Sequence, residues 1–223
     1  MTKGTLKLYR LFTQGQKLTF NKNELILSDL IEADGVYFIE KGVIKVYSIN
    51  KNGDEYINVL WGSGDIFPFT WGYLGRSTRL FYEALDEVSA WRINRSKFLK
   101  FIYTDIKLSN IMAKQMARQY SVLVNRIDNL EYKTASDRVA YCLLYLSERF
   151  GSISDDGVFI NAPLTHDTLA SSLKLARESF SRELEKLASE NIVERRGRSI
   201  VIKEVDRLKG KISEPYESES LVF

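Results

Sequence analysis

The sequence has very few of the residues that build metal and redox centres. Among its 223 residues there is one cysteine, Cys142, and one histidine, His166. A single cysteine excludes an intrachain disulfide and any cluster or zinc site that needs several thiolates from one chain. A single histidine leaves little room for a histidine-based metal centre or catalytic triad. We therefore predict no metal, no cofactor and no catalytic residues.

Long apolar runs and a strong net charge are missing too. No run approaches the roughly 18 apolar residues that a membrane-spanning helix needs. The N-terminus lacks the apolar core of a signal peptide, so we expect a cytoplasmic protein with no membrane partner. The net charge of +3 is too small to indicate nucleic acid by itself. The hydrophobic share of 44% and the charged share of 27% exclude disorder of the whole chain.

Residues 24–93 carry a strand pattern. Short segments rich in β-branched and aromatic residues, such as GVYFIE, GVIKVYSI and EYINVLW, alternate with turn signals. Asn52-Gly53-Asp54 predicts a hairpin turn. Closely spaced short strands are typical of a sandwich, barrel or roll. We predict a β-roll domain over residues 1–104.

The periodicity becomes helical after Asn94. A short helix is followed by a long one over residues 105–132, without glycine or proline. Five apolar positions on it alternate by four and three, as in a coiled-coil seam: Met116, Tyr120, Leu123, Ile127 and Leu130. The alternatives are a helix packed on its own domain and a dimerisation helix. The narrow seam favours the second, a parallel homodimer.

Residues 133–210 predict a DNA-binding domain. A capped helix over 135–150 is followed by a polar loop over 151–157 and a short strand. Next come a short helix, a second helix from about Arg177 to Ser189, and a hairpin turning at Gly197. Helix, turn, helix and hairpin form a winged helix-turn-helix. The acidic tail over 211–223 is predicted to be disordered.

The helix after Arg177 has the features of a recognition helix. Phe180, Leu184 and Leu187 form one apolar face, and polar side chains gather on the other face near the N-terminus. Arginine can donate two hydrogen bonds to guanine, and glutamate can accept one from cytosine. The alternative is an ordinary solvated helix face with local ion pairs. The hairpin, the capped partner helix and the preceding seam together favour DNA reading.

Residues 24–202 resemble the Crp/Fnr family of bacterial transcription regulators. The resemblance rests on the glycine positions within Gly35–Val46 and Gly64-Asp65, and on the segment Met112–Arg118, which resembles the family's dimerisation helix. It is most specific in Arg177-Glu178-x-x-Ser181-Arg182 with the hairpin that follows. It implies an α+β fold with three parts: a jelly-roll-like cyclic-nucleotide-binding-type β-roll, a dimerisation helix and a C-terminal winged helix-turn-helix.

The resemblance also implies roles for individual residues. Arg177, Glu178 and Arg182 would read bases, and Ser181 would help to select a T-rich half-site. Five further positions match residues that touch the DNA backbone in this family: Ser136, His166, Ser179, Arg196 and Arg198. For His166, an ordinary surface position in the first turn of a helix is an equal alternative. The implied partners are double-stranded DNA, a second copy of the chain and RNA polymerase.

Two positions of the helix-turn-helix depart from the family pattern. Lys174 stands where a glycine in left-handed conformation is usual, and Ala176 stands where a serine usually caps the recognition helix. Each change costs about 1 kcal/mol if the geometry is kept. Neither change removes a residue that would read DNA.

The effector pocket departs further. Where nucleotide-binding relatives have a glycine and a ribose-binding glutamate, this chain has Pro68 and Phe69, and Thr78-Arg79 stands at the Arg-Ser pair. The residues at the pocket positions are largely apolar or aromatic: Phe67, Phe69, Trp71, Arg79, Leu123 and Val124. Proline cannot donate an amide, and phenylalanine cannot accept from a ribose hydroxyl. A self-filled core and a pocket for an unknown apolar small-molecule effector both remain open, and cyclic AMP is not expected to bind.

We therefore predict a homodimeric transcription regulator that binds a palindromic operator, does not respond to cyclic AMP and is not an enzyme. An alternative of another class is a sensor module for a cyclic nucleotide or other small molecule that acts on a protein partner. The terminal winged helix argues against that alternative. The sequence does not distinguish an activator from a repressor.

Overall fold

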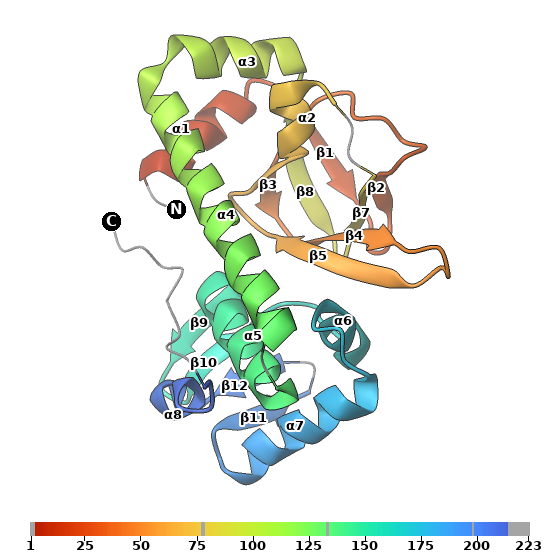
Figure 1. Ribbon diagram of the computed structural model, residues 1–223. Coiled ribbons are helices and arrows are strands. Elements are labelled where there is room, and N and C mark those ends of the chain that lie inside the picture. Colours follow the sequence, from red (N-terminus) through yellow and green to blue (C-terminus); the bar gives the residue numbers. More distant parts are fainter. Residues whose placement is uncertain (1–2, 77–78, 133, 198, 214–223) are drawn as a thin grey trace. The chain divides into compact units, whose positions relative to one another are not determined.

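The computed structural model describes residues 3–76, 79–132, 134–197 and 199–213. The chain forms two compact units, residues 1–117 and 118–223, and the division falls inside the long helix α4 (Ile106–Tyr132) (Figure 1). Each unit has its own sheet and its own buried core, so each is described by itself. The α+β class with an N-terminal roll and a C-terminal winged helix is confirmed.

The described part of the first unit contains two four-stranded antiparallel sheets. Their strand orders are β1-β8-β3-β6 and β2-β7-β4-β5. The strands of the first sheet are β1 (Gln16–Phe20), β8 (Val88–Ile93), β3 (Val36–Lys41) and β6 (Ile66–Phe67). The strands of the second are β2 (Leu25–Leu27), β7 (Phe81–Ala84), β4 (Ile44–Ile49) and β5 (Glu55–Trp61). Most of these strands were predicted from their β-branched and aromatic content.

The β4–β5 hairpin confirms the predicted turn. Gly53 has a φ of 90°, and its amide donates to the carbonyl of Asn50 at 3.1 Å. The Asn50 side chain accepts from the amides of Asn52 and Asp54 at 2.8 and 2.9 Å. A glycine adopts this left-handed backbone without the steric cost of a Cβ, which is why the local sequence was sufficient.

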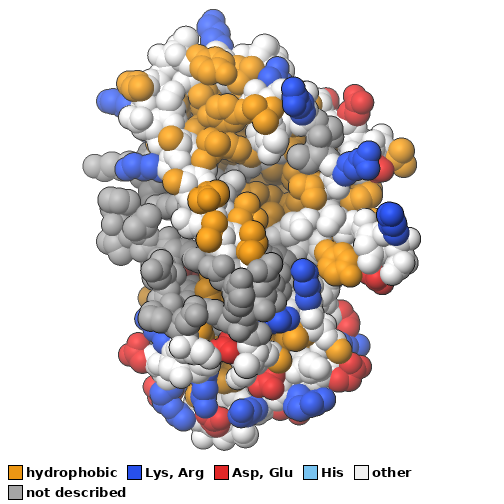
Figure 2. Space-filling view, viewed as in Figure 1, with side chains coloured by type: hydrophobic (Ala, Val, Ile, Leu, Met, Phe, Trp, Pro, Cys, Tyr) orange, Lys and Arg blue, Asp and Glu red, His pale blue; other side chains and the backbone are white. Residues whose placement is uncertain are grey.

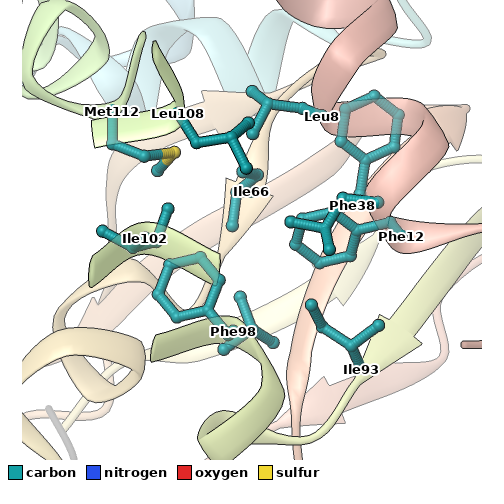
Figure 3. Close-up of a cluster of buried hydrophobic side chains, with 11 residues drawn as sticks. Leu8, Phe12, Phe38, Ile66, Ile93, Phe98, Ile102, Leu108 and Met112 are labelled. Atoms are coloured by element: carbon teal, nitrogen blue, oxygen red, sulfur yellow. The ribbon is translucent and has the colours of Figure 1, made fainter. Parts of the chain in front are cut away.

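Three helices cover the first sheet, and the beginning of α4 joins them. They are α1 (Lys3–Phe12), α2 (Phe69–Leu74) and α3 (Arg95–Thr104). Figure 3 shows the cluster that they enclose with β3, β6 and β8. Its buried side chains include Phe12 and Leu8 from α1, Phe38 from β3 and Phe98 from α3. Leu108 and Met112 extend this core onto α4.

Two of these helices were missed by the sequence analysis. The sequence patterns predict no helix or strand before residue 24, whereas residues 3–20 contain α1 and β1. The aromatic segment after Pro68 was interpreted only as a pocket region, and it folds into α2. Six residues are too few to show a helical period. The helix is held instead by Arg95, whose guanidinium donates to the carbonyls of Trp71, Gly72 and Tyr73 at 2.9–3.2 Å.

The second unit contains the predicted winged helix-turn-helix. Its helices are α5 (Ala135–Phe150), α6 (His166–Ser172), α7 (Arg177–Ser189) and α8 (Val205–Lys209). Its sheet has the order β11-β12-β10-β9, with β9 (Gly151–Ser154), β10 (Gly157–Ile160), β11 (Val193–Arg196) and β12 (Ser199–Ile202). The wing is the β11–β12 hairpin, as predicted.

Residues 151–157 and the C-terminal end differ from the sequence predictions. The polar loop forms β9 and its turn, because β10 supplies a pairing partner that the polar composition did not reveal. The short helix α8 was missed. Lys211–Ser213, assigned to the tail, are packed on the unit: Lys211 pairs with Glu190, and Ser213 donates to Asp137. Residues 214–223 lie outside the described residues.

The predicted seam on α4 is exposed in the single chain. Tyr120 is 71% exposed and Ile127 is 54% exposed, and Met116 and Leu123 are about half exposed. The side chain of Leu130, the last seam position, lies outside the described residues. Within the described parts of the chain, no helix is both long and apolar enough to cross a bilayer.

Candidate nucleic-acid interface

Helix α7 presents two different faces. Phe180 is fully buried and Leu184 and Leu187 nearly so, which confirms the predicted apolar face. This face packs on α5, α6 and β11. Because the apolar residues recur every three or four positions, one side of the helix is held in the core while the other is left to solvent. The position of every polar side chain on α7 follows from this anchoring.

The predicted base-reading residues share the open side of the first two turns of α7. Arg177, Glu178 and Arg182 are exposed, and Ser179 and Ser181 are half-buried. Figure 2 shows Lys and Arg side chains, interspersed with acidic ones, on this part of the second unit. Arg177 pairs with Asp167 at 3.5 Å, and both side chains are largely exposed. Such a pair contributes little in water, so the guanidinium can exchange its partner at small cost.

His166 and Ser181 are brought together by the packing of α6 on α7. The distance from His166 Nδ1 to Ser181 Oγ is 2.9 Å, a hydrogen bond whose direction depends on the tautomer of the ring. The imidazole also stands edge-on to the buried Phe180 ring at 5.3 Å. Burial lowers the pKa of His166, and the charges of Arg195 and Arg177 lower it further. His166 is therefore neutral near pH 7.

The turn between α6 and α7 keeps its geometry despite the two departures. Lys174 has a φ of 51°, the left-handed conformation in which glycine is usual. Ala176 stands at the N-cap of α7 and has no side-chain acceptor for the first amides. The structure thus contains the left-handed backbone and the uncapped helix start from which the two costs were inferred. The turn is closed by its own backbone: the amide of Leu175 donates to the carbonyl of Ala170 at 3.0 Å, and the amide of Lys174 donates to the carbonyl of Ser171 at 3.2 Å.

The wing uses Arg196 internally. Its Nε and Nη2 donate to the two carboxylate oxygens of Glu194 at 2.8 and 3.1 Å, and its Nη1 donates to Asp156 at 2.8 Å. The guanidinium lies 5.2 Å from the Phe159 ring centre. The hydrogen bonds and charges of Arg196 and Lys203 lower the pKa of Glu194 to about 2. Arg196 thus braces the wing against the β9–β10 hairpin.

Arg195, which the sequence analysis left out of the site, is exposed on the other side of the same strand. Successive side chains alternate between the two faces of a strand, so Arg195 and Arg196 could not both brace the wing. This alternation is the sequence signal that could have identified Arg195 as an exposed arginine of the wing. Arg198, a predicted backbone contact, lies outside the described residues.

The start of α5 is capped as predicted. Thr134 Oγ1 accepts from the Asp137 amide at 3.2 Å, and Asp137 accepts from the Thr134 amide at 3.0 Å. Asp137 is only 2% exposed and also accepts from the amide and hydroxyl of Ser213. Hydrogen bonds from Thr134 and Ser213 overcome the cost of burial and lower the pKa of Asp137 to about 2. Ser136, a predicted backbone contact, lies half-buried in this first turn.

In the roll, the predicted pocket residue Phe67 is part of a ring stack. It is 1% exposed, and its ring lies 4.9 Å from Tyr37 and 5.7 Å from Tyr82, nearly parallel to both. The three rings fill the space between the sheets with the chain's own side chains. This arrangement supports the self-filled alternative.

Two other pocket positions of the first unit, Phe69 and Trp71, pack against the buried cluster of Phe12 and Phe98, whereas Phe67 belongs to the cluster of Tyr37 and Tyr82. Phe69 and Trp71 lie half-buried on α2, and Phe69 contacts Tyr73 with ring centres 5.0 Å apart. Arg79 is exposed on the segment before β7, and Thr78 lies outside the described residues. Leu123 and Val124 are partly exposed on α4 in the second unit.

Comparisons with known proteins agree with both units. Residues 17–105 match the model of the cyclic nucleotide-binding domain, and residues 137–210 match that of the Crp-like helix-turn-helix domain. The chain is similar to the cAMP-activated global transcriptional regulator CRP of Salmonella typhimurium, with 26% identity over 182 residues, covering 77% of this chain and 81% of that protein.

Two solved structures are also similar. FixK2 from Bradyrhizobium japonicum superposes with a TM-score of 0.80 at 25% identity, covering 90% of this chain and 98% of that one. A CooA mutant from Carboxydothermus hydrogenoformans superposes with a TM-score of 0.74 at 21% identity, covering 90% of this chain and 89% of the other. The second likeness concerns the fold alone.

Proposed function

The chain belongs to the Crp/Fnr family of transcription regulators, and from this premise we propose that it binds a palindromic operator as a homodimer, without cyclic AMP. The observation that carries the proposal is the first two turns of α7. A buried apolar face fixes the helix, while Arg177, Glu178 and Arg182 stay exposed at its N-terminal end. A recognition helix enters the major groove with this end.

The proposed base contacts follow from the hydrogen-bonding groups. Arg177 and Arg182 carry the forked donors that match guanine O6 and N7, and Glu178 accepts from the amino group of cytosine. By the family resemblance we expect half-sites with a G-T-G-A or T-T-G-A core. Ser136, Ser179, His166, the exposed Arg195 of the wing and, by the family resemblance, Arg198 are proposed to hold phosphates.

The proposed dimer pairs α4 with α4 of a second copy. The exposed apolar side chains of Met116, Tyr120, Leu123 and Ile127 follow the four-and-three spacing of a coiled coil. A parallel pair relates the two recognition helices by a two-fold axis. The major grooves that they enter are then about 34–36 Å apart, one turn of DNA.

The proposed lack of response to cyclic AMP rests on missing groups. Phe69 and Pro68 replace a carboxylate and an amide donor, and Phe67 is already stacked between two tyrosines. Each lost charge-assisted hydrogen bond is worth about 1.5–3 kcal/mol, so losing several moves a micromolar ligand beyond millimolar. A ligand that hardly binds cannot shift the protein between states.

The test is selection of bound DNA from a random pool, followed by mobility-shift assays. We expect two-fold-symmetric sites, and binding that does not change at millimolar cyclic AMP. Asymmetric or single half-sites would overturn the dimer. Micromolar cyclic AMP binding by calorimetry, coupled to tighter operator binding, would overturn the second part. Binding of RNA polymerase to the protein–operator complex is then measured in the same assay.

A further inference from the structure

We propose that His166 sets the direction of the Ser181 hydrogen bond at the DNA interface, so that the preference for one base pair in each half-site changes with pH. The inference rests on the proposed function, because it concerns how the same recognition helix reads DNA. Its starting point is the 2.9 Å contact between His166 Nδ1 and Ser181 Oγ. Ser181 lies on α7, four residues after Arg177.

A serine hydroxyl has one hydrogen to donate and two lone pairs that accept. When His166 is neutral with its proton on Nε2, Nδ1 accepts the Ser181 hydrogen. Ser181 then offers only lone pairs to the groove, and it can accept from the amino group of adenine or cytosine. When His166 is protonated, Nδ1 donates to Ser181. The hydroxyl hydrogen is then free for an acceptor such as guanine O6 or thymine O4.

The same arrangement connects the backbone contact to the base contact. If His166 donates from Nε2 to a phosphate while neutral, Nδ1 carries no hydrogen, because a neutral imidazole has only one N–H. Ser181 must then donate to the ring. While His166 is neutral, a phosphate that it holds through Nε2 therefore leaves Ser181 with only its lone pairs for the bases.

The charges around the ring come from three elements. Arg177 and Glu185 lie on α7, Asp167 lies on α6 and Arg195 lies on β11. Burial and the two arginines lower the pKa of His166, and the two carboxylates oppose this shift in part. The switch is therefore expected below pH 6.5 in the free protein. A DNA phosphate beside the ring would move it upward, toward neutral pH.

The first test needs no DNA. His166 is the only histidine of the chain, so its ring nitrogens give unambiguous NMR signals. We expect the Nε2–H form above pH 7, and a shift of tautomer ratio and pKa in Ser181→Ala. The control is Ser179→Ala, which removes a serine hydroxyl at another position of α7. It should leave the tautomer ratio and the pKa of His166 unchanged. An identical histidine spectrum in Ser181→Ala would overturn the inference whether or not the protein binds DNA.

The second test measures base preference against pH. Two operators that differ only at the base pair whose preference is lost in Ser181→Ala are compared between pH 5.5 and 8.5 at constant salt. We expect their affinity ratio to change about two- to ten-fold per half-site in the wild type. It should stay constant in His166→Gln, which cannot titrate, and in Ser181→Ala.

The outcomes separate the inference from the proposed function. A ratio independent of pH in the wild type, or an equal change in His166→Gln, would overturn the inference while the operator remains. Failure of every variant to select any DNA sequence would instead overturn the proposed function. If the His166–Ser181 contact is purely structural, His166→Gln and Ser181→Ala would change stability, but the affinity ratio of the two operators in the wild type would not change with pH.

Discussion

The predicted pocket residue Phe67 is buried by the chain's own side chains in the roll, whereas the predicted base-reading arginines are exposed in the winged-helix unit. In the roll, the position of Phe67 is closed by Tyr37 and Tyr82, and α2 is fastened by Arg95. In the winged-helix unit, α7 is equally well anchored by Phe180 and Leu184, but Arg177, Glu178 and Arg182 are left exposed. Both units have ordinary buried cores, so the difference concerns the polar groups. At the Phe67 position of the roll, the chain's own rings fill the space that a ligand would need. At the start of α7, hydrogen-bonding groups stay accessible to a ligand.

Phe67→Ala should have the largest effect on stability. Removing a buried phenylalanine costs about 3–5 kcal/mol, from lost apolar burial and from the cavity left behind. Trp61, Trp71 and Trp91, the three tryptophans of the chain, all lie in the first unit, so tryptophan fluorescence during urea unfolding reports on the roll alone. Phe69→Ala, at a half-buried position, is the control and should cost less. An unchanged midpoint in Phe67→Ala would mean that the ring stack is not part of the stable core.

Arg182→Ala should weaken operator binding by about 1–3 kcal/mol per half-site and relax the preference at one guanine. The exposed α7 residue Lys186, near the C-terminal end of the same helix, provides the charge-matched control Lys186→Ala. The measurement is a mobility-shift titration against the selected operator and its single-base variants. Equal losses on all sequences in Arg182→Ala would show that this arginine holds a phosphate and does not read a base.

Asp137→Asn should remove an acid-sensitive part of the second unit's stability. The folded pKa of about 2 lies below the value near 3.8 of the unfolded chain, so the unfolded state binds more protons between these values. The stabilisation is present above pH 4 and is lost as the pH falls toward 2. It amounts to about 2 kcal/mol, since one pKa unit corresponds to about 1.4 kcal/mol.

The measurement is urea unfolding by circular dichroism, taking the transition that tryptophan fluorescence does not report. Asp206→Asn is the control, because the Asp206 side chain is 99% exposed and only weakly paired. We expect the second unit to be less stable at pH 7 in Asp137→Asn than in the wild type. Its free energy of unfolding should also change less between pH 4 and pH 2. If the free energy of unfolding of Asp137→Asn falls with pH as steeply as that of the wild type, the acid sensitivity comes from other carboxylates.

Lys174→Gly and Ala176→Ser should have the smallest effects, and both should stabilise the second unit. Glycine relieves the left-handed backbone at Lys174, and serine accepts from the first amides of α7, each for about 1 kcal/mol. The base preference of the operator should not change, because neither residue is proposed to read a base. Lys174→Ala is the control for the glycine, since it removes the side chain but keeps the strain. A gain in Lys174→Ala equal to that in Lys174→Gly would contradict the strain argument.

The local features of the winged-helix unit were predictable because their signals lie within a few residues. The capping box needs only Thr134 and Asp137, and the apolar face of α7 repeats every three or four residues. The turn at Lys174 was recognised from the family pattern and has the expected left-handed backbone. Most strands of the roll were predicted from short alternating or β-branched segments, and the turn at Gly53 from the Asn52-Gly53-Asp54 sequence.

What the sequence by itself determined is most strands of the roll, the longer helices of the second unit and the polar end of α7, since periodicity and capping are properties of neighbouring residues. The tertiary structure alone decided the partners of the polar groups. Arg95 reaches α2 across 23 residues, and His166 meets Ser181 across 15. Arg196 meets Asp156 across 40 residues. These contacts depend on how elements pack after they have formed, and a side chain's spacing along the chain carries no information about a partner that only packing brings within hydrogen-bonding distance.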